Sequence, residues 1–419
     1  MNFLLITCDQ LRYDAIQCNG NPYVETPNLN RLAERSVRFH QAFCAAPICS
    51  PSRHSLLTGK YPFAHGVVHN GIAPQQPLND VGHELGKAGY RSLNTGAIPH
   101  RLNPSLSFET ISPPNLEDLL SEEQKAAMEW EDKNKRHHAG ASNRPKELHK
   151  GYLSLQTAIA ALEQTAASGQ PFQYWIGFHE PHPPFFPPRP YFDKFETITF
   201  EMPDSVPEDA PPPHPYIQDR KKIWQDMTPE QIRQMTAGYY GLVEMADTFV
   251  GMLLDTLDRL GLTDNTMIIL TADHGEQLGD HGLFLKFVLR DPSVHVPLMI
   301  SHPSLTPGDR HELVSGVDLF PTICDYSGVE APADLHGYSL RPLLENKGSW
   351  PRQDVLAQFN QHIMLRTKEW KLNVYDGELG ELYRLSDDPK EHYNLIGNPE
   401  YAGVAEQLHQ RMQELLSMK

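Results

Sequence analysis

The chain has 419 residues, 39% of them apolar, which is enough for a large packed core and suits one large domain with a smaller appendage. Its formal net charge of -17 excludes long-range attraction for nucleic acid or for anionic membranes, so we expect neither as a partner. An anionic substrate would therefore need positive charge supplied locally.

Three short apolar runs are each followed at once by polar side chains that can do chemistry. The runs cover residues 3–7, 174–178 and 267–270, and they lead to Asp9, His182 and Asp273. Uninterrupted apolar runs of this length are typical of strands that a parallel sheet buries on both faces. Because such sheets bind ligands beyond the carboxyl ends of their strands, we expect the three polar clusters to converge on one crevice.

Helical patterns between these runs predict an alternating α/β chain. Thr26 is expected to cap a helix that opens with Pro27. Apolar spacing predicts a long helix over about 229–260, and another helix is expected to open near residue 318. The segment 181–215 is rich in proline and aromatic residues, which favours an extended loop over the crevice rather than a disordered linker.

The pattern changes after about residue 350. Short strands are expected over 354–359, 362–366 and 370–374, with a final helix near 401–418. We therefore predict a catalytic domain over 1–345 and a small α+β subdomain over 346–419. The N-terminal run follows no basic segment and reads as a strand rather than a signal peptide. No apolar stretch of about 18 residues could span a bilayer, and five scattered cysteines favour a reducing, cytoplasmic location.

The segment Cys49-Ser50-Pro51-Ser52-Arg53 predicts a nucleophile at the start of a helix. Ser50 is expected to cap this helix, with Pro51 in its first turn and Gly59 at its end. The helix dipole and the charge of Arg53 would then lower the pKa of the Cys49 thiol. A small, buried core residue is the alternative for a lone cysteine.

Two pairs of side chains predict a metal site. Asp9 and Gln10 follow the first apolar run, and Asp273 and His274 follow the third. Three oxygen ligands and one imidazole suit a hard or borderline divalent cation. Taken alone, each pair could equally be a turn or a helix cap.

The pattern Cys49-x-Pro51-Ser52-Arg53 with Leu56-Leu57-Thr58-Gly59 resembles the signature of the type I sulfatases, which belong to the alkaline phosphatase superfamily. The resemblance continues through residues 271–276 and 380–391, so it spans the chain from Asp9 to about Leu395. It implies that a formylglycine-generating maturation enzyme oxidises Cys49 to formylglycine. The hydrated aldehyde would attack sulfur, and its second hydroxyl would expel sulfate by elimination.

The same resemblance implies further site residues. His182 would act on the bridging oxygen as a general acid, although it could be an ordinary loop histidine. Lys286, after a glycine-rich turn, would neutralise the non-bridging oxygens, although a surface lysine is the alternative. Asn70 would donate to the same oxygens or simply belong to a turn, and His100 would reach the site. For His179 a structural role is favoured.

Three positions depart from the usual sulfatase pattern. Gln10 stands where many sulfatases carry a second aspartate, His274 where many carry asparagine, and Ala97 where many carry a lysine that touches the formylglycine. Asp-Gln combined with Asp-His resembles the phosphonate monoester hydrolase branch. One anionic ligand fewer and one nitrogen more weaken the preference for calcium, so calcium is expected first and manganese stays open.

The resemblance implies an alkaline-phosphatase-like α/β fold, in which helices flank a mostly parallel central sheet. The expected activity is hydrolysis of a sulfate ester, with a small anionic ester or a sulfated sugar as substrate. The alternative is a phosphonate or phosphate mono- or diester hydrolase that uses the same nucleophile and metal. A rival of another class is a non-catalytic binder of sulfated glycans in which Cys49 stays unmodified.

Overall fold

The computed structural model describes residues 1–74, 76–98 and 107–418. Its core is an eight-stranded sheet with the order β5-β4-β6-β1-β7-β8-β2-β9. The three central strands are β1 (Asn2–Cys8), β6 (Phe172–Phe178) and β7 (Thr266–Ala272), and every residue in them is buried. β1 runs parallel to both neighbours, so the strands predicted from the three apolar runs are confirmed as adjacent members of one sheet.

The remaining strands extend this sheet to both sides. β4 (Arg91–Gly96) and β5 (Glu109–Thr110) continue it in parallel beyond β6. On the other side, β8 (Leu298–Ser301) runs antiparallel to β7 and to β2 (Ser36–Phe39), and β9 (Gly308–Arg310) pairs with β2. A separate short ladder joins β3 (Ala42–Phe43) to β10 (Val314–Ser315).

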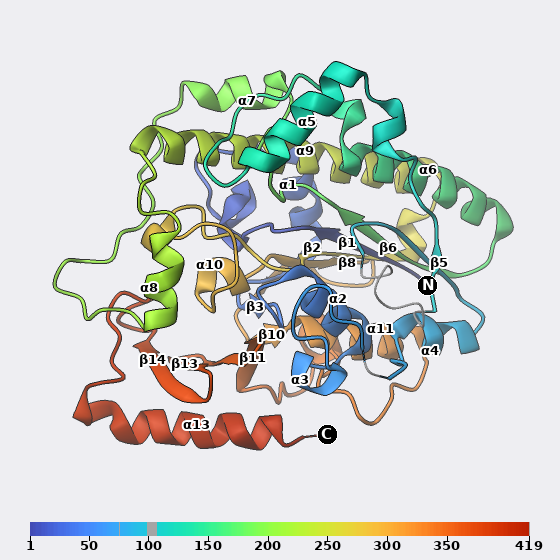
Figure 1. The fold of residues 1–419 in the computed structure, drawn as a ribbon. Helices are drawn as coiled ribbons and strands as arrows, with labels where there is room; N and C mark the ends of the chain where they lie inside the picture. The colour runs from blue at the N-terminus through green and yellow to red at the C-terminus, as the bar shows by residue number, and fades with distance from the viewer. Residues whose placement is uncertain (75, 99–106, 419) are drawn as a thin grey trace.

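Helices cover both faces of the sheet, as Figure 1 shows. Leu4 and Ile6 of β1 face a core that includes the helices α1, α6 and α9, whereas Phe3 and Leu5 face a second core that includes α2, α4 and α11. This alternation is what a strand buried on both faces requires. The helices of these two layers are α1 (Pro27–Glu34), α6 (Lys150–Ser168), α9 (Pro229–Arg259), α2 (Cys49–Thr58), α4 (Val81–Lys87) and α11 (Leu319–Ser327). Further helices are α3 (Pro62–His65), α5 (Glu122–Asn134), α10 (Asp291–Val294) and α12 (Arg341–Leu344).

The cap predicted for α1 is wrong. Thr26 precedes Pro27 as expected, but its hydroxyl accepts a hydrogen bond from the backbone N–H of Gln17, at 3.0 Å, and does not cap the helix. The carboxylate of Asp247 on α9 instead accepts from the backbone N–H groups of Asn28 and Leu29. A charged acceptor from a packed helix therefore replaces the local hydroxyl at this helix start.

The segment predicted as an extended loop over 181–215 contains a helix, α7 (Arg189–Glu196). Phe192 and Phe195 of this helix are buried in a small core with Ala237 of α9. Packing against α9 therefore overrides the local preference of the proline-rich sequence. A second short helix, α8 (Pro215–Lys222), begins at the last residue of this segment.

The C-terminal segment forms its own antiparallel sheet of four strands in sequence order. They are β11 (Asp354–Phe359), β12 (His362–Thr367), β13 (Trp370–Tyr375) and β14 (Glu378–Arg384), and α13 (Ala402–Leu416) packs on them (Figure 1). A buried ion pair of 2.9 Å joins Glu381 of β14 to Arg290, in the segment that follows β7. The division at residue 345 stays a prediction. Within the described ranges, the chain has no helix of the length and apolar character that crossing a membrane requires.

Candidate active site

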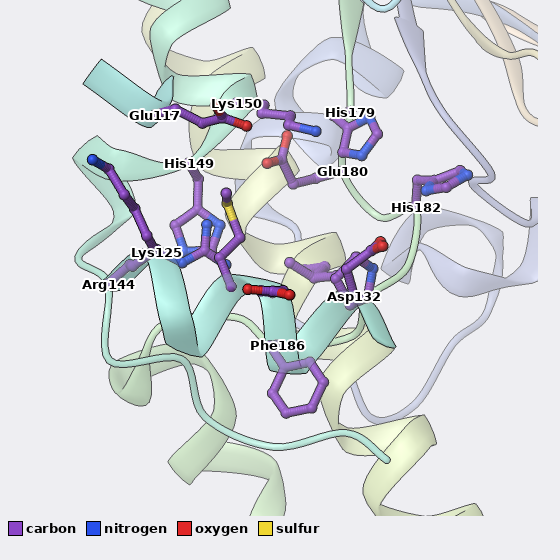
Figure 2. Close-up of a pocket in the computed structure, with 14 residues that line it drawn as sticks. Glu117, Lys125, Asp132, Arg144, His149, Lys150, His179, Glu180, His182 and Phe186 are labelled. Carbon is purple, nitrogen blue, oxygen red and sulfur yellow. The ribbon is translucent and has the colours of Figure 1, made fainter. Parts of the chain in front are cut away.

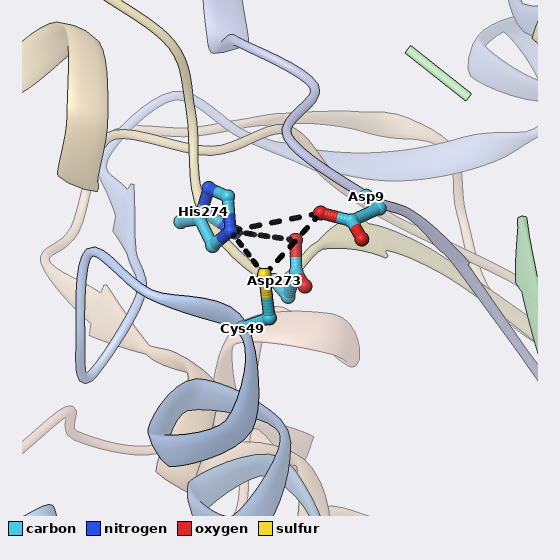
Figure 3. A group of neighbouring side chains, drawn as sticks. All are labelled: Asp9, Cys49, Asp273 and His274. Atoms are coloured by element: carbon cyan, nitrogen blue, oxygen red, sulfur yellow. Dashed lines mark hydrogen bonds and ion pairs between the residues drawn. The ribbon is translucent and has the colours of Figure 1, made fainter. Parts of the chain in front are cut away.

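The carboxyl ends of β1 and β7 and the start of α2 bring four side chains together (Figure 3). Asp9, Cys49, Asp273 and His274 place their ligand atoms within 4.8 Å of one another. Cys49 Sγ is 3.2 Å from His274 Nε2 and 3.8 Å from Asp9 Oδ1. The register that pairs Cys8 with Ala272 explains this, because both aspartates then leave the sheet at the same edge.

These side chains fit a divalent cation. Arg53 binds the outer oxygens of Asp9 and Asp273, which leaves Oδ1 of each carboxylate near His274 Nε2, at 3.6 Å and 3.7 Å. His274 Nδ1 lies 2.9 Å from the Gly275 carbonyl and so carries the proton, which leaves the Nε2 lone pair facing the carboxylates. Two carboxylate oxygens and an oriented imidazole, all buried, are a donor set for such an ion.

Gln10 lies beside this cluster in the left-handed backbone region, with φ 71. Its amide oxygen accepts from Lys286 Nζ at 2.7 Å, and its amide nitrogen donates to Glu276. Lys286 Nζ is also 3.1 Å from Cys49 Sγ, so the two side chains are neighbours, and the predicted catalytic role of the lysine stays a prediction. The role of Gln10 as a metal ligand stays a prediction.

Glu276 is a site residue for which the sequence suggested no role. Its buried carboxylate also accepts from the backbone N–H groups of Leu278 and Leu285, and burial raises its pKa. These contacts hold Gln10 and the turn that carries Lys286. The only signal was its place directly after Asp273-His274-Gly275, because residue type alone does not separate a buried glutamate from a solvated one.

The helix that carries Cys49 begins two residues earlier than predicted, at Cys49 instead of Pro51. Cys49 is its first residue, and the backbone N–H of Ser50 donates to Asn70 Oδ1 at 2.8 Å, so Ser50 is not the cap. Gly59, with φ 63, ends the helix as predicted. Asn70 therefore holds the start of α2, and its contact with substrate oxygens stays a prediction.

The thiol of Cys49 does not have the lowered pKa that the sequence suggested. Burial, followed by the charge of Asp9, raises its pKa to about 11, against the opposing charge of Lys286. Arg53, which is paired with Asp9 and Asp273, also opposes the rise but does not overcome burial. The same pairing, with Lys286, lowers the pKa of Asp9 to about 2 although burial opposes the shift.

His179 and His182 follow β6 and border a cavity of about 590 Å³ (Figure 2). Burial, reinforced by Lys286, lowers the pKa of His182 well below its ordinary range, so the expected near-neutral value is wrong for this state. Burial likewise lowers the pKa of His179 to about 4. His182 Nδ1 lies 2.6 Å from the Pro183 carbonyl and carries the proton, which leaves Nε2 as an acceptor.

The wall of this cavity comes from segments without any recognisable motif. Its other charged lining residues are Glu117, Lys125, Glu129, Asp132, Arg144, Lys150 and Glu180. Glu180 is 3% exposed, its Oε2 has no hydrogen-bond partner among the described residues, and burial raises its pKa to about 7. Polar residues such as these are expected on any helix surface, so sequence reasoning had no means of assigning them to the site.

Two residues singled out from the sequence, Ala97 and His100, lie next to or within residues 99–106, which the structure does not describe. His100 lies outside the described residues, and its role stays a prediction. At Ala97, the backbone N–H donates to the Gly177 carbonyl of β6 at 2.8 Å. The methyl group of Ala97 supplies no cation where many sulfatases have a lysine.

Comparisons with known proteins agree with this geometry. A family model described as Sulfatase matches residues 1–329, and one described as N-sulphoglucosamine sulphohydrolase, C-terminal, matches residues 279–418. A choline-sulfatase of Rhizobium meliloti is 28% identical over 433 residues, which cover 95% of this chain and 83% of that protein. An arylsulfatase of Clostridium perfringens is 27% identical over 446 residues, covering 96% and 91%.

The fold is also that of a solved relative. The crystal structure of the phosphonate monoester hydrolase of Agrobacterium radiobacter superimposes with a TM-score of 0.83 at 24% identity, covering 99% of this chain and 95% of that one. The Sulfatase model alone covers well over half of the sequence. The chain therefore belongs to the type I sulfatases of the alkaline phosphatase superfamily, a family of enzymes that hydrolyse sulfate esters.

Proposed function

We propose that this protein hydrolyses a sulfate ester by means of a formylglycine made from Cys49 and one bound divalent cation, calcium first and manganese second. The observation that carries the proposal is the position of Cys49 Sγ, 3.2 Å from His274 Nε2 and 3.1 Å from Lys286 Nζ. A nucleophile at this point faces metal-binding groups on one side and a fixed cation on the other.

Each neighbouring side chain has a role that its contacts support. Asp9, Asp273 and His274, with Gln10, would hold the cation, which supplies a Lewis acid for the oxygens of the ester. Arg53 orients the two carboxylates through their outer oxygens. Each of these contacts is made before substrate arrives, as electrostatic preorganisation requires.

Lys286 and His182 would act on the ester itself. Lys286 would neutralise the non-bridging oxygens as negative charge moves away from sulfur. His182 presents an unprotonated Nε2 and would take up a proton when the anionic ester binds, because a nearby negative charge favours the imidazolium form. That proton would then pass to the departing alcohol.

Mass spectrometry and one substitution test this function. The peptide that contains Cys49 should lose the mass difference between a thiol side chain and an aldehyde. Cys49→Ala should fold normally and have no turnover of an aryl sulfate. A near-wild-type rate in Cys49→Ala would refute the assignment.

Hydrolysis of a phosphonate or of a phosphate mono- or diester is the second candidate. Gln10, His274 and Ala97 favour it, together with the fold shared with a phosphonate monoester hydrolase. Parallel measurement of kcat/KM on an aryl sulfate, a phenyl phosphonate and a phosphodiester separates the two, since the preferred substrate names the activity.

The proposal includes a partner and a location. The partner is the maturation enzyme that modifies Cys49, and co-expression with it should raise the modified fraction.

All five cysteines are free thiols, which supports a cytoplasmic location. An unmodified Cys49 in protein from its own host, with no turnover of any ester, would instead favour a non-catalytic binder of sulfated glycans.

A further inference from the structure

A second, smaller cavity of about 230 Å³ lies beside the turn that carries Lys286. Arg136 and Arg220 line it, and within the described residues its lining contains no carboxylate. The large cavity beside His182 differs, because four carboxylates line it together with the three cations Lys125, Arg144 and Lys150. The chain has a net charge of -17, yet the only charged residues in the described lining of this cavity are two arginines. Their positive charge favours an anionic ligand.

Among the described residues, three side chains that line this small cavity, those of Arg136, Arg220 and Trp224, donate no hydrogen bond. Across the described ranges, the side chains of Arg136 and Arg220 form no ion pair or hydrogen bond, and the Arg220 guanidinium lies over the Phe287 ring at 5.0 Å. Trp224 is 4% exposed and lines the same cavity, and its Nε1–H has no partner. Arg136 is exposed and Arg220 half-buried, but the N–H of Trp224 is buried. A buried donor without an acceptor is uncommon in folded proteins, so a ligand that accepts a hydrogen bond is expected here.

Two segments that line this cavity also carry residues of the candidate active site. Leu285 and Phe287 both line it, whereas Lys286 between them extends its amine to Cys49. The φ angles of 65° at Leu285 and 78° at Phe287 lie in the left-handed region, which shapes this turn. His69 also lines the cavity, and the next residue, Asn70, holds the first turn of the nucleophile helix.

We propose that the alcohol part of the substrate carries a second anionic group, a carboxylate, sulfate or phosphate, which binds Arg136, Arg220 and the indole N–H of Trp224. The apolar surfaces of Phe287 and Phe359 would contact the carbon skeleton between the two anionic groups. This inference rests on the proposed function, since it places the ester bond at Cys49. In the large cavity four carboxylates offset the three cations, whereas among the described residues no carboxylate offsets the two arginines of the small cavity, which makes the small cavity the more favourable site for the anionic group.

Steady-state kinetics test the proposal with paired substrates. Phenyl sulfate carries one negative charge, and its meta- and para-carboxylate, sulfate and phosphate derivatives carry more than one. The wild-type enzyme should have a higher kcat/KM for at least one of these derivatives than for phenyl sulfate. Arg136→Gln and Arg220→Gln should each lower that value about 10- to 100-fold, mostly through KM, because each removes a charged hydrogen bond.

A matched control separates local binding from net charge. Lys222→Gln removes one positive charge from the same helix as Arg220, but Lys222 is 67% exposed and does not line the cavity. It should leave both kinds of substrate unaffected. Trp224→Phe keeps an aromatic ring without the N–H and should weaken only the derivatives. Equal losses on phenyl sulfate and on its derivatives, or no derivative preferred by the wild type, would overturn the proposal.

Product inhibition makes this test independent of the reaction that Cys49 performs. The hydroxybenzoate released from a preferred derivative should inhibit the wild type more strongly than phenol does, and this difference should vanish in Arg220→Gln. If sulfates are not hydrolysed but phenyl phosphonate is, the proposed function fails while the inhibition still reports on the arginines. If phenyl sulfate is hydrolysed and hydroxybenzoate inhibits no better than phenol, the second anion site alone fails.

Discussion

Lys286 contacts both Cys49, the proposed nucleophile position, and Gln10, a proposed metal ligand. It is 5% exposed, and its amine lies 3.1 Å from Cys49 Sγ and 2.7 Å from Gln10 Oε1. Lys286→Met keeps an unbranched side chain of similar length and removes the charge. The substitution therefore tests the electrostatic role of the amine with little change in packing.

The structure gives the size of both expected effects. Loss of a preorganised donor to transition-state charge costs about 2.7–4 kcal/mol, or about 10²–10³ in kcat. The buried amide oxygen of Gln10 would also lose its donor, which lowers the free energy of unfolding by about 1–3 kcal/mol. A protein of ordinary stability remains folded after such a loss.

The assay is the steady-state hydrolysis of an aryl sulfate with saturating metal, normalised to the modified fraction from the mass of the Cys49 peptide. Lys221→Met is the matched control, because Lys221 is half-buried near Gly282 but contacts neither Cys49 nor Gln10. The control should keep wild-type kcat. If Lys286→Met keeps kcat within about threefold of wild type, the amine does not stabilise transition-state charge.

Three further predictions concern the metal, pH and packing. Chelation of the metal should abolish turnover. Calcium or manganese at about 100 times Kd should raise the free energy of unfolding of the wild type by about 2.7 kcal/mol and leave that of Asp273→Asn unchanged. A wild-type stability that responds to neither ion would contradict the metal site. Burial lowers the pKa of His149 to about 3 in the folded protein. As the pH drops from about 6.5 towards 3, the imidazole is therefore protonated in the unfolded chain but not in the folded one, and the free energy of unfolding should fall. His149→Gln should flatten that slope by up to about 1.4 kcal/mol per pH unit in urea unfolding, and an unchanged slope would count against a buried neutral ring. A Cβ at Gly151 would lie 1.8 Å from Glu180 Oε2, so Gly151→Ala should lower the unfolding free energy by about 1–3 kcal/mol. Gly86→Ala meets no atom within 4 Å and should be neutral or slightly stabilising, and equal effects of the two would disprove the clash.

The local pattern of the sequence is sufficient to predict the elements that position the site. The runs at 3–7, 174–178 and 267–270 became β1, β6 and β7, and the apolar spacing near 229–260 became α9. A strand buried on both faces and a long amphipathic helix each have a period that is visible without their neighbours. Because parallel strands end at one edge, the convergence of Asp9, Asp273 and His274 could be predicted as well.

Only the tertiary structure decided how charges and caps are paired. Asp247 takes over the cap of α1 from Thr26. Arg53 pairs with two carboxylates, and burial together with Asp9 raises the pKa of Cys49 although Arg53 acts to lower it. Such pairings join residues tens to hundreds of positions apart. Their partners are chosen by the packing of whole elements, and no local pattern records that choice.

The lining of the cavities is likewise decided by the packing of segments that lie far apart in the sequence. Arg136 and Arg220 meet at one small cavity although 83 residues separate them, and each alone resembles an ordinary surface cation. The sequence by itself determined the central strands of the sheet and which side chains are candidates for the nucleophile and the metal ligands, because these depend on runs and motifs within single segments. The fold decided which charges remain free to meet a substrate, because a charge is free only when no other segment neutralises it.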